Sequence, residues 1–310
     1  MYQSRRHVRV VAATVAAIAL PATALVLSSA TQATAGARPA VAAPAPAAAA
    51  KARPQSSDVV GLTDKGRLVK FRTASPDRIR RTARVQGLMD DQRLIGIDYR
   101  VQNGKLYGVG DRGGIYTINT ASDFGRATKV SQLTVALDGQ NFGVDFNPAA
   151  NRLRVISDTG QNLRHNLDDP AGAPAAGTTA TDGTLAYPGV PPAPPTTATQ
   201  VTAAAYTNND LDPNTATTLF DIDTNLDQVV IQSPANAGLL AATGKLTIDA
   251  NQPAGFDISS QGGGNRGLAA LSTGTRMRLY DINLTTGKAT RLGSFPSNAQ
   301  VVDLAVPIAR

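Results

Sequence analysis

Four aspartates stand at the same place in short phrases that recur along the chain, and their type and spacing could do chemistry. The phrases are GIDY, GVDF, GFDI and VVDL, and the residues are Asp98, Asp145, Asp257 and Asp303. Several carboxylate oxygens at close range are the ligands that Ca²⁺ prefers. If the fold brings these side chains together, we expect a calcium site, which in an enzyme would polarise a carbonyl oxygen and activate water.

The same aspartates have a structural alternative. A carboxylate at the junction of two structural units can accept backbone N–H hydrogen bonds and need no metal. A further copy of the phrase, in QVTAAAYTN (residues 200–208), has Ala205 where the aspartate should stand. Because the set is incomplete, the sequence favours the structural role and leaves calcium binding as the alternative.

A second group of oxygen-bearing side chains alternates along the segment NNDLDPN: Asn208, Asp210, Asp212 and Asn214. Ligands at every second residue are how calcium loops surround an ion. Pro213 stands where such a loop needs its turning glycine, and Leu219 where it needs a bidentate glutamate. We therefore interpret the segment as a surface turn rich in Asp and Asn, with a metal site at Asp210 and Asp212 as the alternative.

His165 is the only histidine after His7, and Asp168 and Asp169 follow it closely. An imidazole beside a carboxylate can act as a general base. However, His165 aligns with Ile118 of the preceding repeat, inside a predicted strand. We therefore expect a packing or surface histidine.

The elements that position these residues belong to an internal repeat. Three segments align without gaps at a spacing of 47 residues: LTDKGRLVKFRTAS (62–75), VGDRGGIYTINTAS (109–122) and ISDTGQNLRHNLDD (156–169). The alignment places three further aspartates in register, each two residues before a glycine: Asp64, Asp111 and Asp158. This spacing is typical of tight turns, so we interpret these aspartates as hairpin residues.

Each repeat contains four short predicted strands separated by turn residues. In the second repeat they cover roughly residues 94–99, 105–110, 114–119 and 127–133. A repeat of forty to fifty residues with four strands indicates an all-β protein of the β-propeller class. A two-sheet sandwich is the rival fold, but it would not explain the constant register.

The ends of the chain predict how the ring closes. The first repeat lacks its first strand, and the terminal VVDLAVP (residues 301–307) is a first strand without a sequel. We therefore expect the N- and C-terminal strands to pair within one blade. The count is five blades, or six if residues 239–249 contain another.

The repeated motifs resemble a known family. The segments GIDYR, LYGVGDRGGIYTIN, GVDFNPAANRLRVISDTGQNLRHN, AAAYTNN and TTLFDIDTNLDQV are similar to those of the secreted bacterial family catalogued as domain of unknown function 4394. The resemblance extends over residues 59–307. It implies an exported β domain built from repeats and no established reaction.

The N-terminal region predicts export. Residues 1–35 combine a basic start, an apolar run and the small-residue site Ala33-Thr34-Ala35, as in a cleaved signal peptide. The arginine pair Arg5-Arg6 also allows a twin-arginine signal. Residues 36–57 are rich in Ala and Pro, which indicates a flexible spacer, and residues 58–310 form the propeller domain. We expect a secreted protein without a lasting membrane span.

Charge and composition narrow the functions. The formal net charge of +7 falls to +1 from Asp58 onward, with 24 basic against 23 acidic residues, so we expect no nucleic-acid partner. The chain has no Cys and no Glu, and it contains no Gly-x-Ser-x-Gly motif. The segment QGGGNRG lacks the Lys-Ser/Thr ending of a phosphate-binding loop. Haem, copper and quinone sites are disfavoured, and calcium is the one cofactor that the residues suggest.

Two functions therefore remain. The first is a non-enzymatic extracellular propeller that binds a protein, a glycan or a small ligand through one face. The alternative is a calcium-dependent hydrolase that resembles propeller lactonases and uses the four recurrent aspartates. Such hydrolases usually include a Glu among their metal ligands, and this sequence has none. The first function is favoured.

Overall fold

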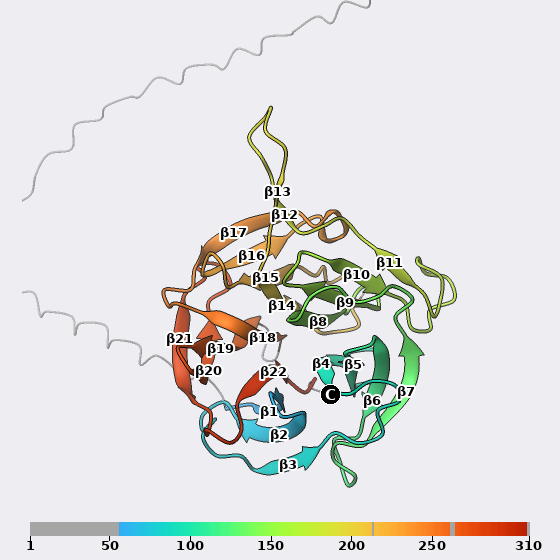
Figure 1. Ribbon diagram of the computed structural model, residues 1–310, viewed down its shortest axis with the longest axis vertical. Helices are drawn as coiled ribbons and strands as arrows, with labels where there is room; N and C mark the ends of the chain where they lie inside the picture. Colours follow the sequence, from blue (N-terminus) through green and yellow to red (C-terminus); the bar gives the residue numbers. More distant parts are fainter. Residues whose placement is uncertain (1–55, 213, 261–263, 309–310) are drawn as a thin grey trace, which may run out of the picture. The chain divides into compact units, whose positions relative to one another are not determined.

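Five four-stranded antiparallel sheets are arranged in a ring around a central axis (Figure 1). The computed structural model describes residues 56–212, 214–260 and 264–308. The predicted signal peptide and all but the last two residues of the predicted spacer lie outside this range. Four strands in each of five units confirm the predicted all-β propeller with five blades.

Blades 1 to 3 come largely from the N-terminal half of the domain. Blade 1 consists of β22 (Val301–Ala305), β1 (Asp58–Thr63), β2 (Arg67–Arg72) and β3 (Arg81–Arg84). Blade 2 consists of β4 (Leu94–Arg100), β5 (Lys105–Gly110), β6 (Gly114–Ile118) and β7 (Ala127–Gln132). Blade 3 consists of β8 (Phe142–Asn147), β9 (Arg152–Ser157), β10 (Asn162–His165) and β11 (Thr179–Thr181).

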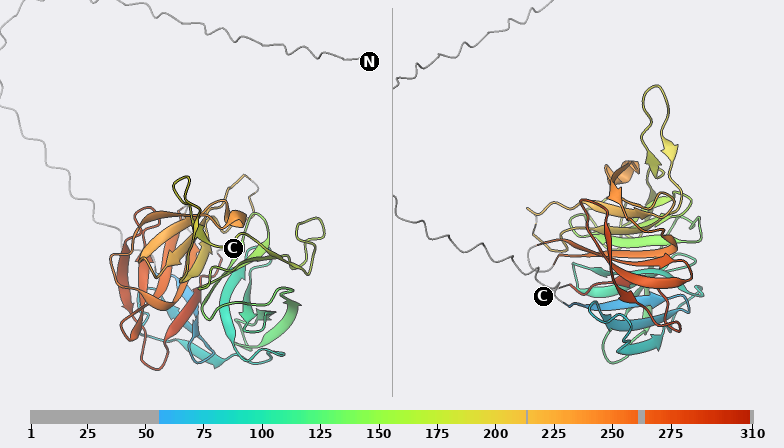
Figure 2. Two further views of the ribbon diagram at one scale, coloured as in Figure 1. Left: turned by 45° about the horizontal axis from the view of Figure 1, so that its top comes forward. Right: turned by 90° about the vertical axis from the view of Figure 1, so that its left-hand side faces the viewer.

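Blades 4 and 5 complete the ring. Blade 4 consists of β14 (Val201–Tyr206), β15 (Leu219–Asp223), β16 (Gln228–Gln232) and β17 (Leu240–Lys245). Blade 5 consists of β18 (Asn251–Ser259), β19 (Arg266–Thr273), β20 (Arg276–Ile282) and β21 (Ala289–Ser294). A short hairpin of β12 (Ala186–Tyr187) and β13 (Thr196–Thr197) projects from the ring between blades 3 and 4 (Figures 1 and 2). Residues 239–249, considered as a sixth blade, contain the outer strand of blade 4 instead.

The ring closes as the sequence predicts. β1 pairs antiparallel with β22, with Val60 opposite Ala305 and Leu62 opposite Asp303. The first and last strands of the domain therefore belong to one sheet. In this closed ring each blade packs against two neighbours, and no blade ends the array.

The hydrophobic core lies between the blades. Side chains on a strand alternate between the two faces of the sheet, and here each face packs against a neighbouring blade. β14 is accordingly buried at all six positions. Between blades 5 and 1, the rings of Phe71 and Phe295 meet edge to face at 5.1 Å. Strands buried on both faces explain why this sequence alternates so little between apolar and polar residues.

The hairpin aspartates have the predicted role in turns. The glycine two residues after each adopts a positive φ: 64° at Gly66, 84° at Gly113 and 90° at Gly160. Asp111 also accepts the N–H of Gln92 at 2.8 Å, and Asp158 accepts the N–H of Gln140 at 3.0 Å. These two carboxylates thus tie a hairpin to the segment that enters the innermost strand of the same blade.

Candidate functional site

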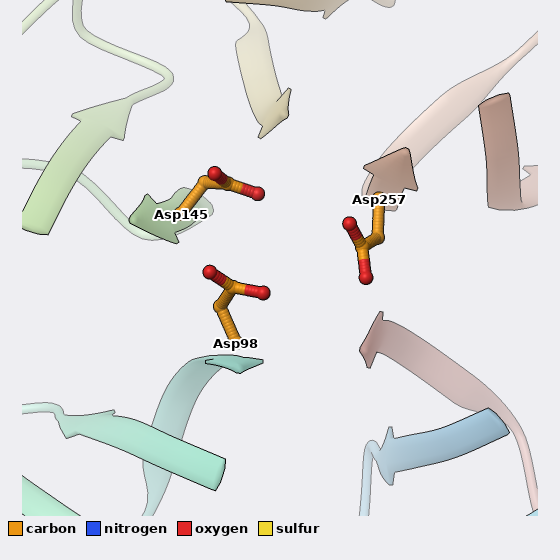
Figure 3. Close-up of side chains that lie close together, drawn as sticks. All are labelled: Asp98, Asp145 and Asp257. Carbon is orange, nitrogen blue, oxygen red and sulfur yellow. The ribbon is translucent and has the colours of Figure 1, made fainter. Parts of the chain in front are cut away.

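Three carboxylates converge on the axis of the propeller. Asp98, Asp145 and Asp257 lie on β4, β8 and β18, the innermost strands of blades 2, 3 and 5. One oxygen of each lies within 4.8 Å of the corresponding oxygens of the other two. Figure 3 shows the three side chains directed toward a common space. Their residues are at most 5% exposed, so the carboxyl groups are buried at the axis.

Hydrogen bonds between blades define which positions are equivalent. Asp98 accepts the N–H of Phe146 at 2.8 Å, Asp145 that of Tyr206 at 3.2 Å, and Asp257 that of Val306 at 2.6 Å. Each donor is the residue after the equivalent position in the next blade. The axial ring therefore consists of one position per blade: Ala305, Asp98, Asp145, Ala205 and Asp257.

Asp303 lies outside this ring, two residues before Ala305. Its Oδ2 accepts the N–H of Ile97, the residue before Asp98, at 2.7 Å. It therefore occupies the level of the glycines Gly96 and Gly255 and does not join the group formed by Asp98, Asp145 and Asp257. The four aspartates of the recurrent phrases are thus not equivalent, because VVDL is displaced in register from GIDY.

Three aspartates satisfy the backbone donors of all five blades. Asp98 also accepts the N–H of Tyr99 at 2.6 Å, and Asp257 also accepts that of Ile258 at 2.5 Å. These are the two blades whose preceding neighbour has an alanine in the axial ring. The structural role anticipated for the aspartates is therefore present in the hydrogen bonds. Oδ2 of Asp145 is the axial oxygen that forms no hydrogen bond with the described residues.

The glycines of the recurrent phrases let the innermost strands approach closely. A Cβ atom on Gly96 would lie 2.4 Å from Cγ2 of Val144, and one on Gly143 would lie 2.7 Å from the backbone nitrogen of Ala204. A Cβ on Gly255 would lie 2.4 Å from Cα of Asp303. Contacts this short leave no room for a side chain. Glycine and aspartate together therefore hold adjacent blades at the axis.

Burial dominates the electrostatics of the axial carboxyl groups. It raises the pKa of Asp98 and of Asp145 well above the usual range, and their negative neighbours raise it further. Burial also raises the pKa of Asp257 to about 6. No Lys, Arg or His among the described residues forms a hydrogen bond or an ion pair with these three groups. Protons or a bound cation must then offset their charge.

The three residues fit a hard divalent cation. Ca²⁺ binds oxygen at about 2.3–2.6 Å, so two ligands on opposite sides of the ion are about 5 Å apart. The separation of at most 4.8 Å between the axial oxygens matches this requirement. Asp145 adds an oxygen that no protein donor occupies. The donor set is therefore chemically suitable for calcium, with its remaining ligands to come from water or a bound molecule.

A groove lies beyond the ends of the innermost strands β4, β14, β18 and β22, and none of the three axial aspartates lines it. It consists of two cavities of about 170 and 430 Å³ that share Asn209, Asp210 and Ile308. The smaller cavity includes Ser259, two residues after Asp257, and Val306, whose N–H binds Asp257. We call these two cavities the axial groove. At the opposite end, a separate cavity of about 170 Å³ is lined by polar residues that include Arg93 and Asn141.

The second predicted metal site has a different geometry. Oδ1 of Asp210 accepts the N–H of Asp212 at 2.9 Å, and Oδ1 of Asp212 accepts the N–H of Asn214 at 2.9 Å. These are the contacts of consecutive Asx turns, which the sequence favoured. Asp210 nevertheless lines the axial groove. Within the described residues, the one group of three potential metal ligands is the axial set.

His165 is a packing residue, as expected. It is fully buried between Ser131 and Thr179, whose hydroxyl oxygens lie 2.8 Å from Nε2 and 2.9 Å from Nδ1. Burial lowers its pKa to about 4. Asp168 and Asp169 bind Arg100 and Arg152 instead. A histidine–carboxylate base is therefore not formed.

One buried acid has no counterpart among the predicted residues. Asp221 on β15 is 0% exposed, and neither carboxyl oxygen has a hydrogen-bond partner among the described residues. Burial raises its pKa well above the usual range, and Arg154 partly opposes this rise. In LFDID the aspartate resembles the outward-facing residue of a half-buried strand. Only the packing of both faces of the blade reveals that it is buried.

Ring closure, blade count and axial geometry together define a five-bladed β-propeller with a carboxylate cluster on its axis. The chain belongs to the family described as Domain of unknown function (DUF4394), whose model matches residues 67–305. This match confirms the resemblance drawn from the repeated motifs. A search of curated proteins finds no match. No helix within the described ranges is long and apolar enough to cross a membrane.

Several solved structures are partly similar to this chain. A structural genomics protein of unknown function from Bacteroides thetaiotaomicron gives a TM-score of 0.46 at 12% identity, over 82% of this chain and 65% of that one. An auxiliary nutrient binding protein from the same organism gives a TM-score of 0.41 at 12% identity, over 79% of this chain and 58% of that one. Glutaminyl cyclase from Myxococcus xanthus gives a TM-score of 0.42 at 12% identity, over 71% of this chain and 84% of that one. The chain thus spans less than two thirds of each Bacteroides protein, and TM-scores below 0.5 support no inference about function.

Proposed function

We propose that the protein is an exported, non-enzymatic binding propeller that holds Ca²⁺ between Asp98, Asp145 and Asp257 and takes a polar ligand in the axial groove. One observation carries the proposal. Three buried carboxyl groups present oxygens within 4.8 Å of one another and have no basic partner among the described residues. Export rests on the signal-like sequence of residues 1–35.

Electrostatics supports a cation at this place. Ionised carboxylates that share a buried space repel one another and lose the solvation that water would provide. Backbone N–H groups offset part of this cost, but they carry only partial charges. A divalent cation offsets the rest and keeps the groups ionised at neutral pH. Without the cation, protons must take its place.

The axial groove supports the binding of a polar ligand. Its walls carry amide and hydroxyl groups from Asn209, Ser259 and Ser260, and Leu211 at its edge is 63% exposed. Amide and hydroxyl groups form directional hydrogen bonds with uncharged polar molecules. A glycan or a small polar molecule suits such walls.

Thermal unfolding tests the cation. A ligand that binds only the native state raises its stability, so saturating Ca²⁺ should raise the Tm by roughly 5–10 °C over the value with a chelator. Asp145→Asn should abolish this shift, because it weakens the ligand whose Oδ2 has no protein donor. The matched control is Asp212→Asn in the loop, which should keep the full shift.

The outcomes separate the two candidate sites. A shift that persists in Asp145→Asn and disappears in Asp212→Asn would move the ion to the loop. Equal Tm values with calcium and with chelator in the wild-type protein would contradict the axial ion altogether.

The same material tests the enzymatic alternative. A calcium-dependent hydrolase would use the same axial residues, so wild-type protein is incubated with lactone and ester substrates in calcium. We expect no turnover above the uncatalysed rate. Calcium-dependent turnover that is lost in Asp257→Asn would replace the binding function by hydrolysis.

A further inference from the structure

Blade 1 places like charges directly opposite one another. In the pairing of β2 with β3, Arg67 faces Arg84 and Lys70 faces Arg81. Like charges at opposed positions of an antiparallel pair destabilise the sheet. Burial and the nearby charge of Arg81 lower the pKa of Lys70. Lys70 and Arg81 are held by the carbonyl oxygens of Thr120, Ala121 and Ser122 in blade 2. The side chain of Arg84, opposite Arg67, has no such partner among the described residues, which favours a binding role for this pair.

The charge of the domain is concentrated in this blade. Residues 58–88 contain eight basic and three acidic residues, whereas residues 89–310 contain 16 basic and 20 acidic residues. The near-neutral total therefore conceals a positive region. We call it the basic face: the basic residues at the outer edge of blade 1, which are Arg67, Lys70, Arg72, Arg78, Arg80, Arg81 and Arg84. Arg67 and Arg84 lie on the side of this edge toward blade 5, and Lys70 and Arg81 lie on the side toward blade 2. β3 forms the outer edge of blade 1 at the rim of the ring (Figure 1).

The structure fixes part of the basic face in place. The guanidinium of Arg81 donates to the carbonyl oxygens of Ala121 and Ser122, and it lies 4.9 Å from the ring centre of Phe124. Arg72 and Arg80 share one carboxylate, that of Asp58. A group held in position loses little conformational entropy when a ligand binds. These arginines are therefore preorganised, and their charge is only partly compensated.

Two arginines of the face remain available. Arg78 and Arg84 are exposed, and their side chains form no hydrogen bond or ion pair with the described residues. A cavity of about 500 Å³ between blades 1 and 5 is lined by the charged residues Arg67 and Asp77 and by polar residues such as Thr82 and Asn298. Because Arg84 pairs with Arg67, it stands beside this cavity. The face thus combines free guanidinium groups with a recess.

We propose that the basic face binds an anionic carbohydrate polymer, a chain that carries sulfate, phosphate or carboxylate groups at intervals. Planar guanidinium groups bind such oxyanions through two parallel hydrogen bonds, and several along a sheet edge match a repeating charge. Nucleic acid fits less well, because binding of single strands uses exposed aromatic side chains, and Phe124 is 6% exposed beneath Lys70 and Arg81.

Salt elution from immobilised heparin, a sulfated polysaccharide, tests the proposal with the full-length protein. The double variant Arg78→Gln/Arg84→Gln removes two charges from the face. The matched control Lys105→Gln/Lys288→Gln removes two exposed lysines from blades 2 and 5. We expect the first pair to weaken binding at low salt at least tenfold and the control less than twofold, with the Tm unchanged in both.

Three results would overturn the proposal. The first is that the wild-type protein binds neither heparin nor polyuronate. The second is that both double variants lose affinity equally, which would show that only the net charge of the protein matters. The third is that duplex DNA or vesicles of anionic lipid bind as tightly as heparin at the same salt concentration, which would assign another class of partner. The calcium experiments do not involve this face, so either proposal can fail without the other.

Discussion

At the scale of a single residue, Asp221 is a carboxyl group buried among apolar side chains. It pairs with Ala204 on β14 and Val230 on β16, which belong to the apolar core between blades 3 and 4. The positively charged Arg154, which lowers the pKa of Asp221, donates to Tyr206, Asn162, Asp182 and Asn236 instead. A buried carboxyl without a partner destabilises the folded state once it ionises. It is therefore a weak point of the core.

Replacing Asp221 should stabilise the protein in a pH-dependent way. The pKa of Asp221 is higher in the folded than in the unfolded protein, so at low pH the carboxyl is protonated in both states and does not destabilise the fold. As pH rises above the unfolded pKa, the free energy of unfolding falls. Asp221→Asn removes this loss. We expect the variant to gain about 1–3 kcal/mol of unfolding free energy at pH 7.5 and much less at pH 4.5, measured by urea denaturation.

Asp223 on the same strand is the control. It is also buried, but it accepts hydrogen bonds from the hydroxyl of Tyr187 and the N–H groups of Asn225 and Leu226. Asp223→Asn should therefore destabilise the protein. A loss of stability in Asp221→Asn at pH 7.5 would indicate that the carboxyl has a partner in solution.

At the scale of the strand, the Gly-x-Asp phrase is a junction between blades. Its glycine removes the side chain that would separate two innermost strands, and its aspartate binds the backbone of the next strand. In blade 3 these residues are Gly143 and Asp145, which contact Ala204 and Tyr206. The recurrence of the phrase thus reflects a repeated contact, and the proposed calcium ligands occupy three of its five positions.

Gly143→Ala tests the close approach. The new Cβ would lie 2.7 Å from the backbone nitrogen of Ala204, and a backbone atom cannot rotate away as a side chain can. We expect a loss of about 1–3 kcal/mol in unfolding free energy, measured by thermal or urea denaturation. Gly264→Ala is the control, since nothing lies within 4 Å of its Cβ position. Equal stability of the two variants would contradict the proposed packing.

At the scale of the strand, similar sequence segments can also occupy positions that are not equivalent. The spacing of 47 residues predicts the blades, because pairing within a blade is local and each copy repeats the same turns. VVDL matches GIDY by its letters, but the register of Asp303 is set by pairing with Leu62 at the far end of the domain. The sequence alone therefore predicts three axial aspartates and misplaces a fourth.

At the scale of the whole molecule, one strand closes the ring. β22 supplies the innermost strand of blade 1, and Val306 just beyond it donates to Asp257 of blade 5. Without β22, β1 would present an unpaired edge to solvent. The blades could be predicted one at a time from the sequence. The cavities could not, because they depend on which blades become neighbours.

Removal of β22 should therefore affect the entire domain. A chain that ends at Gln300 is expected to lose cooperative unfolding and to self-associate, as measured by differential scanning calorimetry and sedimentation. The control replaces Pro188–Pro195, in the projecting hairpin, by Asn-Gly and should keep the Tm within a few degrees. Cooperative unfolding of the truncated monomer would show that four complete blades and an open fifth are sufficient.

Ring closure also has a consequence for the time course of folding. Val60 can meet Ala305 only after almost the whole domain lies between them. Contacts between residues so distant in sequence form slowly, because a long loop must close before they contribute. The final packing of blade 1 is therefore a late event in folding. The ring of a newly made chain closes more slowly than a fold built from contacts between residues close in sequence. Under the proposed export, a slowly closing ring would give a machinery that threads unfolded chains time to act before the propeller is complete.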